Sequence, residues 1–227
     1  MSVLDVLFPP RCAACGALLP DSAPLCETCQ ATLLDAPEPA CPRCAEPVSG
    51  PDETCARCRR DPPPFSRVQV AFGFEGAMSE AIPRFKYQDR PFLAGPLVAL
   101  AWPRLQSALV GLDAIAPIPL HTARLRERGF DQALLLAQEL ATRAKLTLLP
   151  ELLVRTRATE HQVGARREAR AENLRGAFAV ASDGRIPKRL ALIDDVVTTT
   201  ATARDAARAL RDAGAEEIRV LALARAL

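Results

Sequence analysis

Apolar and polar positions change their spacing several times over residues 65–227. Short apolar runs, which favour buried strands, occupy residues 67–74, 113–118, 147–155, 177–180, 190–193 and 218–224. Apolar residues at helical spacing predict helices over residues 76–87, 92–109, 131–143 and 201–213, and a short charged helix is expected over residues 166–174. Because strands alternate with helices, we predict an α/β fold with a right-handed, mostly parallel sheet flanked by helices.

The first 62 residues follow none of these patterns and differ in composition. All eight cysteines lie between Cys12 and Cys58, and 12 of the 20 prolines lie within the first 64 residues. Seven of the eight phenylalanines lie beyond that point. We therefore expect two domains, residues 1–62 and 65–227, joined by an extended connector at Pro62–Pro64.

The cysteines form a duplicated set of metal ligands. The pattern C-x2-C-x10-C-x2-C occurs twice, 29 residues apart, as Cys12, Cys15, Cys26, Cys29 and then Cys41, Cys44, Cys55, Cys58. Paired C-x2-C motifs bring four thiolates into the tetrahedral geometry of structural Zn²⁺ sites. We expect two small zinc ribbons whose folding energy comes from the metal, with the four-cysteine sets either sequential or interleaved.

Three other uses of the cysteines fit less well. Disulfides conflict with the reducing compartment that we expect for this chain. A redox C-x-x-C normally occurs singly beside a thioredoxin-like pattern. An iron–sulfur cluster is a minor alternative, because ferredoxin-type spacings differ from this one.

The chain carries no sign of secretion or membrane insertion. No stretch approaches 18 uncharged apolar residues, and Met1–Pro10 has neither a basic start nor a long apolar run. We therefore expect a cytoplasmic protein without membrane insertion. The net charge of +2 does not by itself predict affinity for nucleic acid.

The segment Leu190–Thr202, L-A-L-I-D-D-V-V-T-T-T-A-T, is the first candidate site. Functional groups in parallel sheets collect just beyond the carboxyl ends of strands, where we place Asp194 and Asp195. These carboxylates are followed by small residues that enter a helix. The pattern predicts a sugar diol beside a phosphate rather than carboxylates that only solvate a strand end. The residues expected to hold the phosphate are Thr198, Thr199, Thr200, Ala201 and Thr202.

Basic segments after two other predicted strands supply counterparts to this acidic pair. One is the loop after Ile118, with Arg124 and Arg128, and the other contains Arg155, Arg167 and Arg170. If each segment follows a parallel strand, all three lie at one edge of the sheet, where guanidinium groups can clamp phosphate oxygens. We expect Arg126 on a solvated face. The P-loop and dinucleotide-binding motifs are absent from the sequence.

Three stretches of the sequence resemble known families. L-A-L-I-D-D-V-V-T-T-T-A-T resembles the motif with which type I phosphoribosyltransferases bind 5-phosphoribosyl-1-pyrophosphate (PRPP). P-I-P-L-H-T-A-R-L-R-E-R-G-F-D-Q-A and R-T-R-A-T-E-H-Q are similar to the ComF family of competence-associated proteins, and the likeness covers essentially the whole chain.

This resemblance implies a type I phosphoribosyltransferase-like fold and a role for each segment. Asp194 and Asp195 would contact the ribose hydroxyls, and residues 198–202 would hold the 5-phosphate. The segment Pro117–Arg128 would face the pyrophosphate with Mg²⁺, and Lys86 would lie near the side that takes the base. The motif has Gly where this chain has Thr200, and a Cβ there disfavours a positive φ. The sequence therefore leaves open whether the chain is an enzyme.

Three functions follow, in order of preference. The first is a ComF-like protein that binds PRPP, with phosphoribosyltransferase activity, and acts in uptake of transforming DNA, with single-stranded DNA and a competence helicase-type ATPase as partners. The second is a non-catalytic adaptor that binds single-stranded DNA, against which the aromatic content of 4% counts. The third is a nucleobase-salvage phosphoribosyltransferase, for which no base-specific motif stands out.

Overall fold

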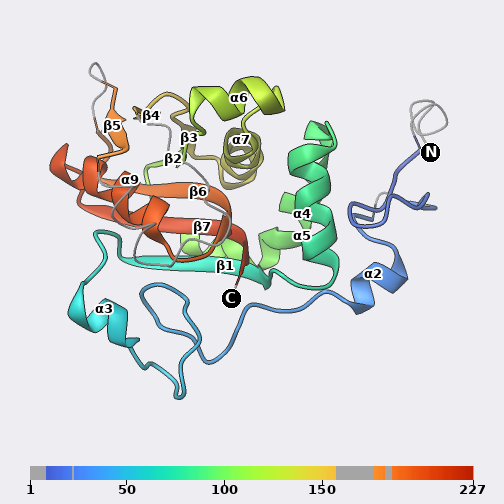
Figure 1. The fold of residues 1–227 in the computed structure, drawn as a ribbon, viewed down its shortest axis with the longest axis horizontal. Coiled ribbons are helices and arrows are strands. Elements are labelled where there is room, and N and C mark those ends of the chain that lie inside the picture. The colour runs from blue at the N-terminus through green and yellow to red at the C-terminus, as the bar shows by residue number, and fades with distance from the viewer. Residues whose placement is uncertain (1–8, 22, 157–175, 182–185, 227) are drawn as a thin grey trace.

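The computed structural model describes residues 9–21, 23–156, 176–181 and 186–226. Its centre is a five-stranded sheet in the order β1-β7-β6-β2-β3 (Figure 1). Every pair in this sheet is parallel. This confirms the predicted fold class. The strands are β1 (Arg67–Gly73), β2 (Ala114–Pro117), β3 (Thr147–Leu148), β6 (Arg189–Val197) and β7 (Glu217–Arg225).

Helices cover both faces of the sheet. One face packs against α4 (Ala77–Tyr87), α5 (Ala94–Leu105) and α7 (Gln132–Ala144), and the other against α9 (Ala201–Asp212). Successive residues of a strand point to opposite faces, so Ala191 and Ile193 join the first core and Leu190 and Leu192 the second. Burial on both faces explains why the sequence of β6 is continuously apolar before its carboxylates.

Two predicted elements are divided. The helix expected over residues 92–109 consists of η1 (Pro91–Leu93), α5 and η2 (Gln106–Leu109). The prediction of one strand over residues 147–155 was wrong. This range contains β3 followed by β4 (Leu153–Arg155). Pro150 lies between them and interrupts the strand, because proline cannot donate a hydrogen bond to a sheet ladder.

The direction of β4 overturns a further prediction. β4 pairs antiparallel with β5 (Phe178–Val180) in a separate two-stranded sheet. The segment after Arg155 therefore does not follow a parallel strand, as we had expected. The helix predicted over residues 166–174, including Arg167 and Arg170, lies outside the described residues.

The duplication of the cysteines is also a duplication of structure. Each ribbon has one antiparallel bridge, Arg11 with Leu18 and Ala40 with Pro47. Each also has a five-residue helix, α2 (Glu27–Ala31) and α3 (Ala56–Arg60). Bridges and helices are displaced by the same 29 residues as the cysteines (11 to 40, 27 to 56).

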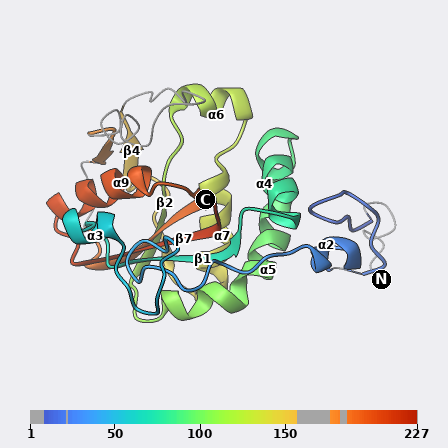
Figure 2. The same cartoon turned by 60° about the horizontal axis from the view of Figure 1, so that its bottom comes forward.

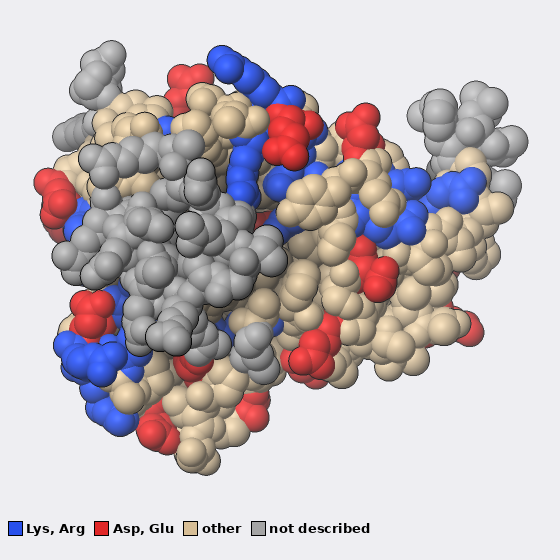
Figure 3. All heavy atoms as spheres, in the orientation of Figure 1, with Lys and Arg blue, Asp and Glu red and all other residues tan. Residues whose placement is uncertain are grey.

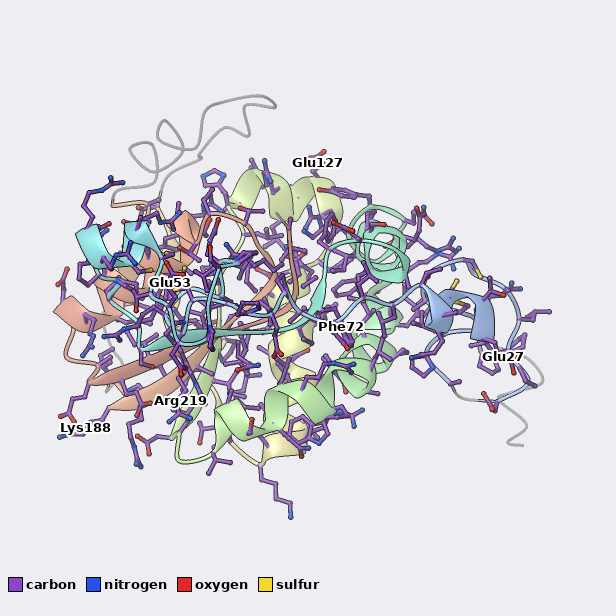
Figure 4. The ribbon with its side chains drawn as sticks, turned by 90° about the horizontal axis from the view of Figure 1, so that it is seen from below. Glu27, Glu53, Phe72, Glu127, Lys188 and Arg219 are labelled. Carbon is purple, nitrogen blue, oxygen red and sulfur yellow. The ribbon has the colours of Figure 1, made fainter. Side chains whose placement is uncertain are left out.

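The two ribbons lie at opposite ends of the molecule, as the positions of Glu27 and Glu53 show (Figure 4). The first ribbon joins the core around α4, where Leu19 and Leu25 are buried. The segment between the ribbons runs along β1, where Asp35 bridges Phe72 and the Gly73 N–H donates to the Leu34 carbonyl at 3.1 Å. This segment covers an edge that would otherwise expose unpaired backbone groups. Among the described helices, none has the length and apolar character needed to span a bilayer.

Candidate functional site

The acidic pair lies inside a strand. β6 continues to Val197, and Asp194 is in register with Ala222 of β7, so the expectation that both carboxylates lie beyond the strand end was wrong. The apolar Val196 and Val197 after the pair extend the strand by pairing with β7. Asp195 is buried and Asp194 is half-buried. Two adjacent carboxylates are therefore held on rigid backbone near the carboxyl edge of the sheet.

Lys86, in the last turn of α4, pairs with one of these carboxylates. Its ammonium group forms an ion pair with the carboxylate of Asp195, and both side chains are largely buried. Burial raises the pKa of Asp194 to about 7, although the charge of Lys86 opposes the increase. Burial lowers the pKa of Lys86 to about 8, with Asp194 opposing and the charges of Arg128 and Arg124 adding to the decrease. The centre therefore changes its proton content close to neutral pH.

The basic segment after β2 is a helix, not the loop predicted from its sequence. α6 (Thr122–Arg128) begins where the Nδ1 atom of His121 accepts the Ala123 N–H at 3.2 Å. It ends at Gly129, whose φ of 80° is the left-handed conformation typical of a helix C-terminus. The segment has no apolar stripe, which is why hydrophobic spacing missed the helix.

Helical spacing places two arginines of α6 on one face. Arg124 and Arg128 are four residues apart and half-buried, whereas Arg126 is exposed, as predicted. The Arg128 guanidinium lies over the Tyr87 ring, 4.8 Å from its centroid, and hydrogen-bonds the Gln132 side chain. Lys and Arg side chains gather over α6 in the space-filling view (Figure 3).

Arg155, at the end of β4, is a fourth cation in this neighbourhood. Its guanidinium lies 5.4 Å from the centroid of the Phe178 ring. Burial lowers the pKa of Arg155, Arg124 adds to the decrease, and Asp194 opposes it. The structure thus brings cations from α4, α6 and β4 together around the carboxylates of β6, although these elements are far apart in sequence.

One carboxylate that sequence reasoning missed positions this cluster. Asp131 precedes α7 and accepts the N–H groups of Leu120 at 2.9 Å and Leu134 at 3.1 Å. It therefore ties the segment after β2 to the start of α7 and lies close enough to raise the pKa of Asp194. An Asp just before a helical pattern is a capping signal, so the sequence did contain a hint.

The loop Thr198–Thr200 connects β6 to α9, and Ala201 and Thr202 are the first residues of that helix. Thr200 is buried and has φ 59° and ψ 6°, which is the left-handed region. The positive φ that a Cβ disfavours is therefore present here, on a β-branched residue. Thr198 is exposed, and Thr199, Ala201 and Thr202 are half-buried. The first N–H groups of a helix lack acceptors within the helix, so this loop presents donors for an anion.

A residue of the second ribbon contacts this loop. The Nη2 atom of Arg57, in α3, donates to the Thr199 carbonyl and to the Thr200 hydroxyl. Sequence analysis did not identify Arg57, because 142 residues separate it from Thr199 and no local pattern predicts the contact.

The eight cysteines form two separate clusters, Cys12, Cys15, Cys26, Cys29 and Cys41, Cys44, Cys55, Cys58. Within each, the ligand atoms lie within 4.8 Å of one another. This grouping confirms the sequential arrangement. A tetrahedral Zn²⁺ with Zn–S of about 2.3 Å needs sulfurs roughly 3.8 Å apart. The Cys15–Cys26 and Cys44–Cys55 sulfurs are 3.7 and 3.6 Å apart, so both sets fit zinc.

At one cysteine of each cluster, the local backbone favours the thiolate form that binds zinc. Burial raises the pKa of Cys12 and of Cys41, but backbone N–H groups outweigh it. The N–H groups of Cys15, Cys26 and Ala14 leave the pKa of Cys12 at about 6. Those of Cys55, Cys44 and Arg43 leave the pKa of Cys41 at about 7. Burial raises the pKa of Cys29, Cys44 and Cys58, and the charges of neighbouring cysteines add to the increase. A cation among the four sulfurs would offset this repulsion.

Comparisons with known proteins agree with this architecture. The double zinc ribbon domain family matches residues 3–59. Competence protein F of Haemophilus influenzae is 32% identical over 195 residues, which cover 83% of this chain and 85% of that protein. DNA utilization protein YhgH of Escherichia coli strain K12 is 32% identical over 195 residues, with coverage of 82% and 84%. The protein of the same name from Salmonella typhi is 30% identical over 200 residues, with coverage of 82% and 84%.

Fold and cysteine centres together define an α/β protein with a parallel sheet and an N-terminal double zinc ribbon. The likeness to competence protein F extends over more than four fifths of both chains. The chain belongs to the ComF family, as its sequence motifs had indicated.

Proposed function

We propose that this chain binds PRPP, or another ligand with a phosphoribosyl group, at the carboxyl end of β6. The observation that carries the proposal is the order of groups along β6 and α9. Two carboxylates are followed within a few residues by a left-handed threonine and a helix N-terminus. A sugar diol and a phosphate on one ligand need hydrogen-bond acceptors and N–H donors in this order.

Each group has a role in this proposal. Asp194 and Asp195 accept hydrogen bonds from the ribose hydroxyls, and residues 198–202 donate to the 5-phosphate. Arg124 and Arg128 face the pyrophosphate, which Mg²⁺ accompanies as part of the ligand. We assign Arg167 and Arg170, outside the described residues, to the same group. Lys86 holds the carboxylate pair when no ligand is bound and adds positive charge when the pyrophosphate arrives.

Phosphoribosyl transfer is the reaction that such a site supports. A nitrogen nucleophile attacks the ribose carbon as pyrophosphate departs, and the chain contributes positioning and neutralisation of charge. In this proposal, the cations Lys86, Arg124 and Arg128 neutralise the negative charge that develops on the leaving pyrophosphate. Thr200 stands where the PRPP-binding motif has glycine, and it adopts the left-handed backbone conformation that glycine favours. Threonine in place of glycine therefore does not by itself remove the phosphate site.

The names of the relatives connect this chemistry with DNA. Because these relatives are called competence and DNA utilization proteins, we infer that the chain acts in uptake or use of DNA. Single-stranded DNA and a helicase-type ATPase are the partners that we propose for it.

A specific observation favours direct contact with single-stranded DNA as a second candidate. Tyr87 and Phe92 are exposed to 70% and 63%, and the Arg128 guanidinium of α6 lies over the Tyr87 ring. Exposed aromatic rings beside cations can stack bases while the cations neutralise phosphates. Affinity for an oligonucleotide should then fall steeply with salt and fall again in Tyr87→Ala. A shallow salt dependence would count against this candidate.

Calorimetric titration with PRPP and Mg²⁺ tests the leading proposal. The wild-type chain should release or absorb heat with a saturable isotherm, and Asp194→Asn should weaken binding at least tenfold. Asp212→Asn, an exposed change at the far end of α9, is the matched control and should bind like the wild type. Absence of a saturable isotherm for the wild type would exclude PRPP as the ligand.

A further inference from the structure

The second zinc ribbon lies against the start of α9. Figure 2 draws α3 beside α9, and hydrogen bonds of Arg57 and Arg204 join the two elements. Arg57 stands between Cys55 and Cys58 of the second cysteine cluster, so a zinc ion held by these cysteines would fix its backbone. From this position, Nη2 of Arg57 reaches the Thr199 carbonyl and the Thr200 hydroxyl.

A second arginine makes the reverse contact. Arg204, in the first turn of α9, is buried. It donates to the Asp61 carboxylate at 2.9 Å and to the Asp61 carbonyl at 2.8 Å. It also donates to the Cys58 sulfur at 3.8 Å. Arg57 and Arg204 therefore link α3 and the β6–α9 loop in both directions.

A third contact holds the ribbon from its other side. Arg225, at the end of β7, is almost completely buried. It donates to the Cys44 carbonyl at 2.7 Å and to the Glu46 carboxylate. Arg225 contacts Cys44 and Arg204 contacts Cys58, so the ribbon is attached through both of its cysteine pairs. These attachments hold the backbone that carries Arg57 against the α/β part of the chain.

The atoms that Arg57 contacts decide what it can do there. Its partners are the Thr199 carbonyl and the oxygen of the Thr200 hydroxyl, and both accept hydrogen bonds from the guanidinium. A phosphate would use the N–H groups at the start of α9, and a guanidinium, having only donors, does not compete for them. Arg57 therefore leaves the anion-binding donors available and adds a positive charge beside them.

The same contact supports the strained backbone of the loop. Thr200 has a left-handed conformation that a β-branched residue rarely adopts, so neighbouring contacts must hold it. Bonds from one guanidinium nitrogen to Thr199 and Thr200 bridge the two residues at this turn. Two of the five guanidinium donors are used in this way, which leaves three for other acceptors.

We propose that Arg57 is a phosphate-binding residue of the β6–α9 loop, supplied by the second zinc ribbon. The anion site is then composite, because the α/β part provides N–H donors and the ribbon provides the guanidinium. The ligand class is a phosphomonoester such as the 5-phosphate of a ribose. This inference rests on the proposed function and extends it, since it gives a ribbon a part in ligand binding.

Arg57→Ala and Arg60→Ala form a matched pair. Both remove one positive charge from α3, but Arg60 is exposed and only Arg57 reaches the loop. Calorimetry with ribose 5-phosphate and with PRPP should show binding at least tenfold weaker in Arg57→Ala and within about twofold of wild type in Arg60→Ala. Both variants should retain two zinc ions per chain by metal analysis, which excludes unfolding of the ribbon as the cause.

Arg57→Lys provides a second test if Arg57→Ala loses zinc. Lysine keeps the positive charge but lacks the fork of guanidinium donors. The affinity of Arg57→Lys for the ligand should therefore be weaker than that of wild type and Arg60→Ala but not lost completely. Equal binding in the Arg57 and Arg60 variants, or tighter binding in Arg57→Ala, would overturn the inference while leaving the proposed function intact. Failure of the wild-type chain to bind either ligand would overturn both.

Discussion

At the scale of single residues, Thr200 has the least expected conformation. A left-handed conformation costs an ordinary residue roughly 1–2 kcal/mol, because Cβ approaches the following carbonyl oxygen. Thr200 is nevertheless buried, and its hydroxyl accepts a hydrogen bond from Arg57. The hydroxyl, which glycine lacks, gives the loop a connection to the second ribbon in exchange for backbone strain.

Two substitutions separate strain from hydrogen bonding at this position. Thr200→Gly relieves the strain and loses the hydroxyl, so the free energy of unfolding should change by less than about 1 kcal/mol. Thr200→Val keeps the strain and leaves Arg57 without that acceptor, so it should destabilise the chain by about 1–3 kcal/mol. Urea unfolding measures both. Equal destabilisation by the two variants would show that the left-handed conformation is not strained.

Asp194 should give the stability a characteristic dependence on pH. In the folded chain it keeps its proton up to about pH 7, whereas an unfolded Asp loses its proton near pH 4. Between these values the unfolded state binds fewer protons, so stability falls as pH rises from about 4 to 7. Lys86 is charged in both states over this range and adds no slope, since its folded pKa is about 8.

Unfolding of Asp194→Asn from pH 4 to 7 checks this expectation. The free energy of unfolding of the variant should fall less between pH 4 and 7 than that of the wild type. One titrating group can contribute at most about 1.4 kcal/mol per pH unit to this difference. Asp212→Asn should keep the wild-type profile. A profile for Asp194→Asn that coincides with the wild type would mean that Asp194 is already ionised in the folded chain.

At the scale of elements, hydrophobic spacing was informative where burial is uniform. β6 and β7 are buried on both faces, and their continuous apolar runs predicted where both strands lie, although β6 continues through its two carboxylates to Val197. The spacing failed for α6, which is short and charged and depends on His121 and Gly129 at its ends. It failed again at Pro150, where two short strands were predicted as one. The carboxylates were predicted from a motif, but Arg57 was not, because its contact depends on how the ribbon packs.

The helical form of α6 makes a specific prediction about its arginines. Arg124 and Arg128 share the face toward the carboxylates, and Arg126 points to solvent. Arg124→Ala should weaken PRPP binding about tenfold, as expected for loss of one charge-assisted hydrogen bond of about 1.5 kcal/mol or more. Arg126→Ala should have almost no effect in the same calorimetric experiment. Similar losses in both variants would indicate a general effect of charge rather than a site on one face.

At the scale of the whole molecule, the two ribbons are parts of the structure rather than appendages. The first contributes Leu19 and Leu25 to the core around α4, and the second places Ala45 in the core on the α9 side. We propose that residues 1–62 and residues 65–227 are nevertheless two domains, because only residues 1–62 depend on metal for their folding energy.

Removal of zinc should act in two stages. A strong chelator should unfold residues 12–58 first, seen as rapid hydrogen exchange in that region by mass spectrometry. The remaining part should then be destabilised by about 3 kcal/mol, because buried Arg225 loses the Cys44 carbonyl and Glu46 as partners. In Arg225→Met this second effect should largely disappear. Protection of residues 12–58 that survives chelation would contradict the assignment of zinc.

The ligand site at the end of β6 is central to the proposed function, and a crystal structure of the chain with ribose 5-phosphate would show where this ligand binds. We predict phosphate density over the N–H groups at the start of α9, within hydrogen-bonding distance of Arg57. The ribose hydroxyls should contact Asp194 or Asp195. A ligand bound elsewhere, or a loop that remains empty at saturating concentration, would contradict the proposed binding of a phosphoribosyl group at the end of β6.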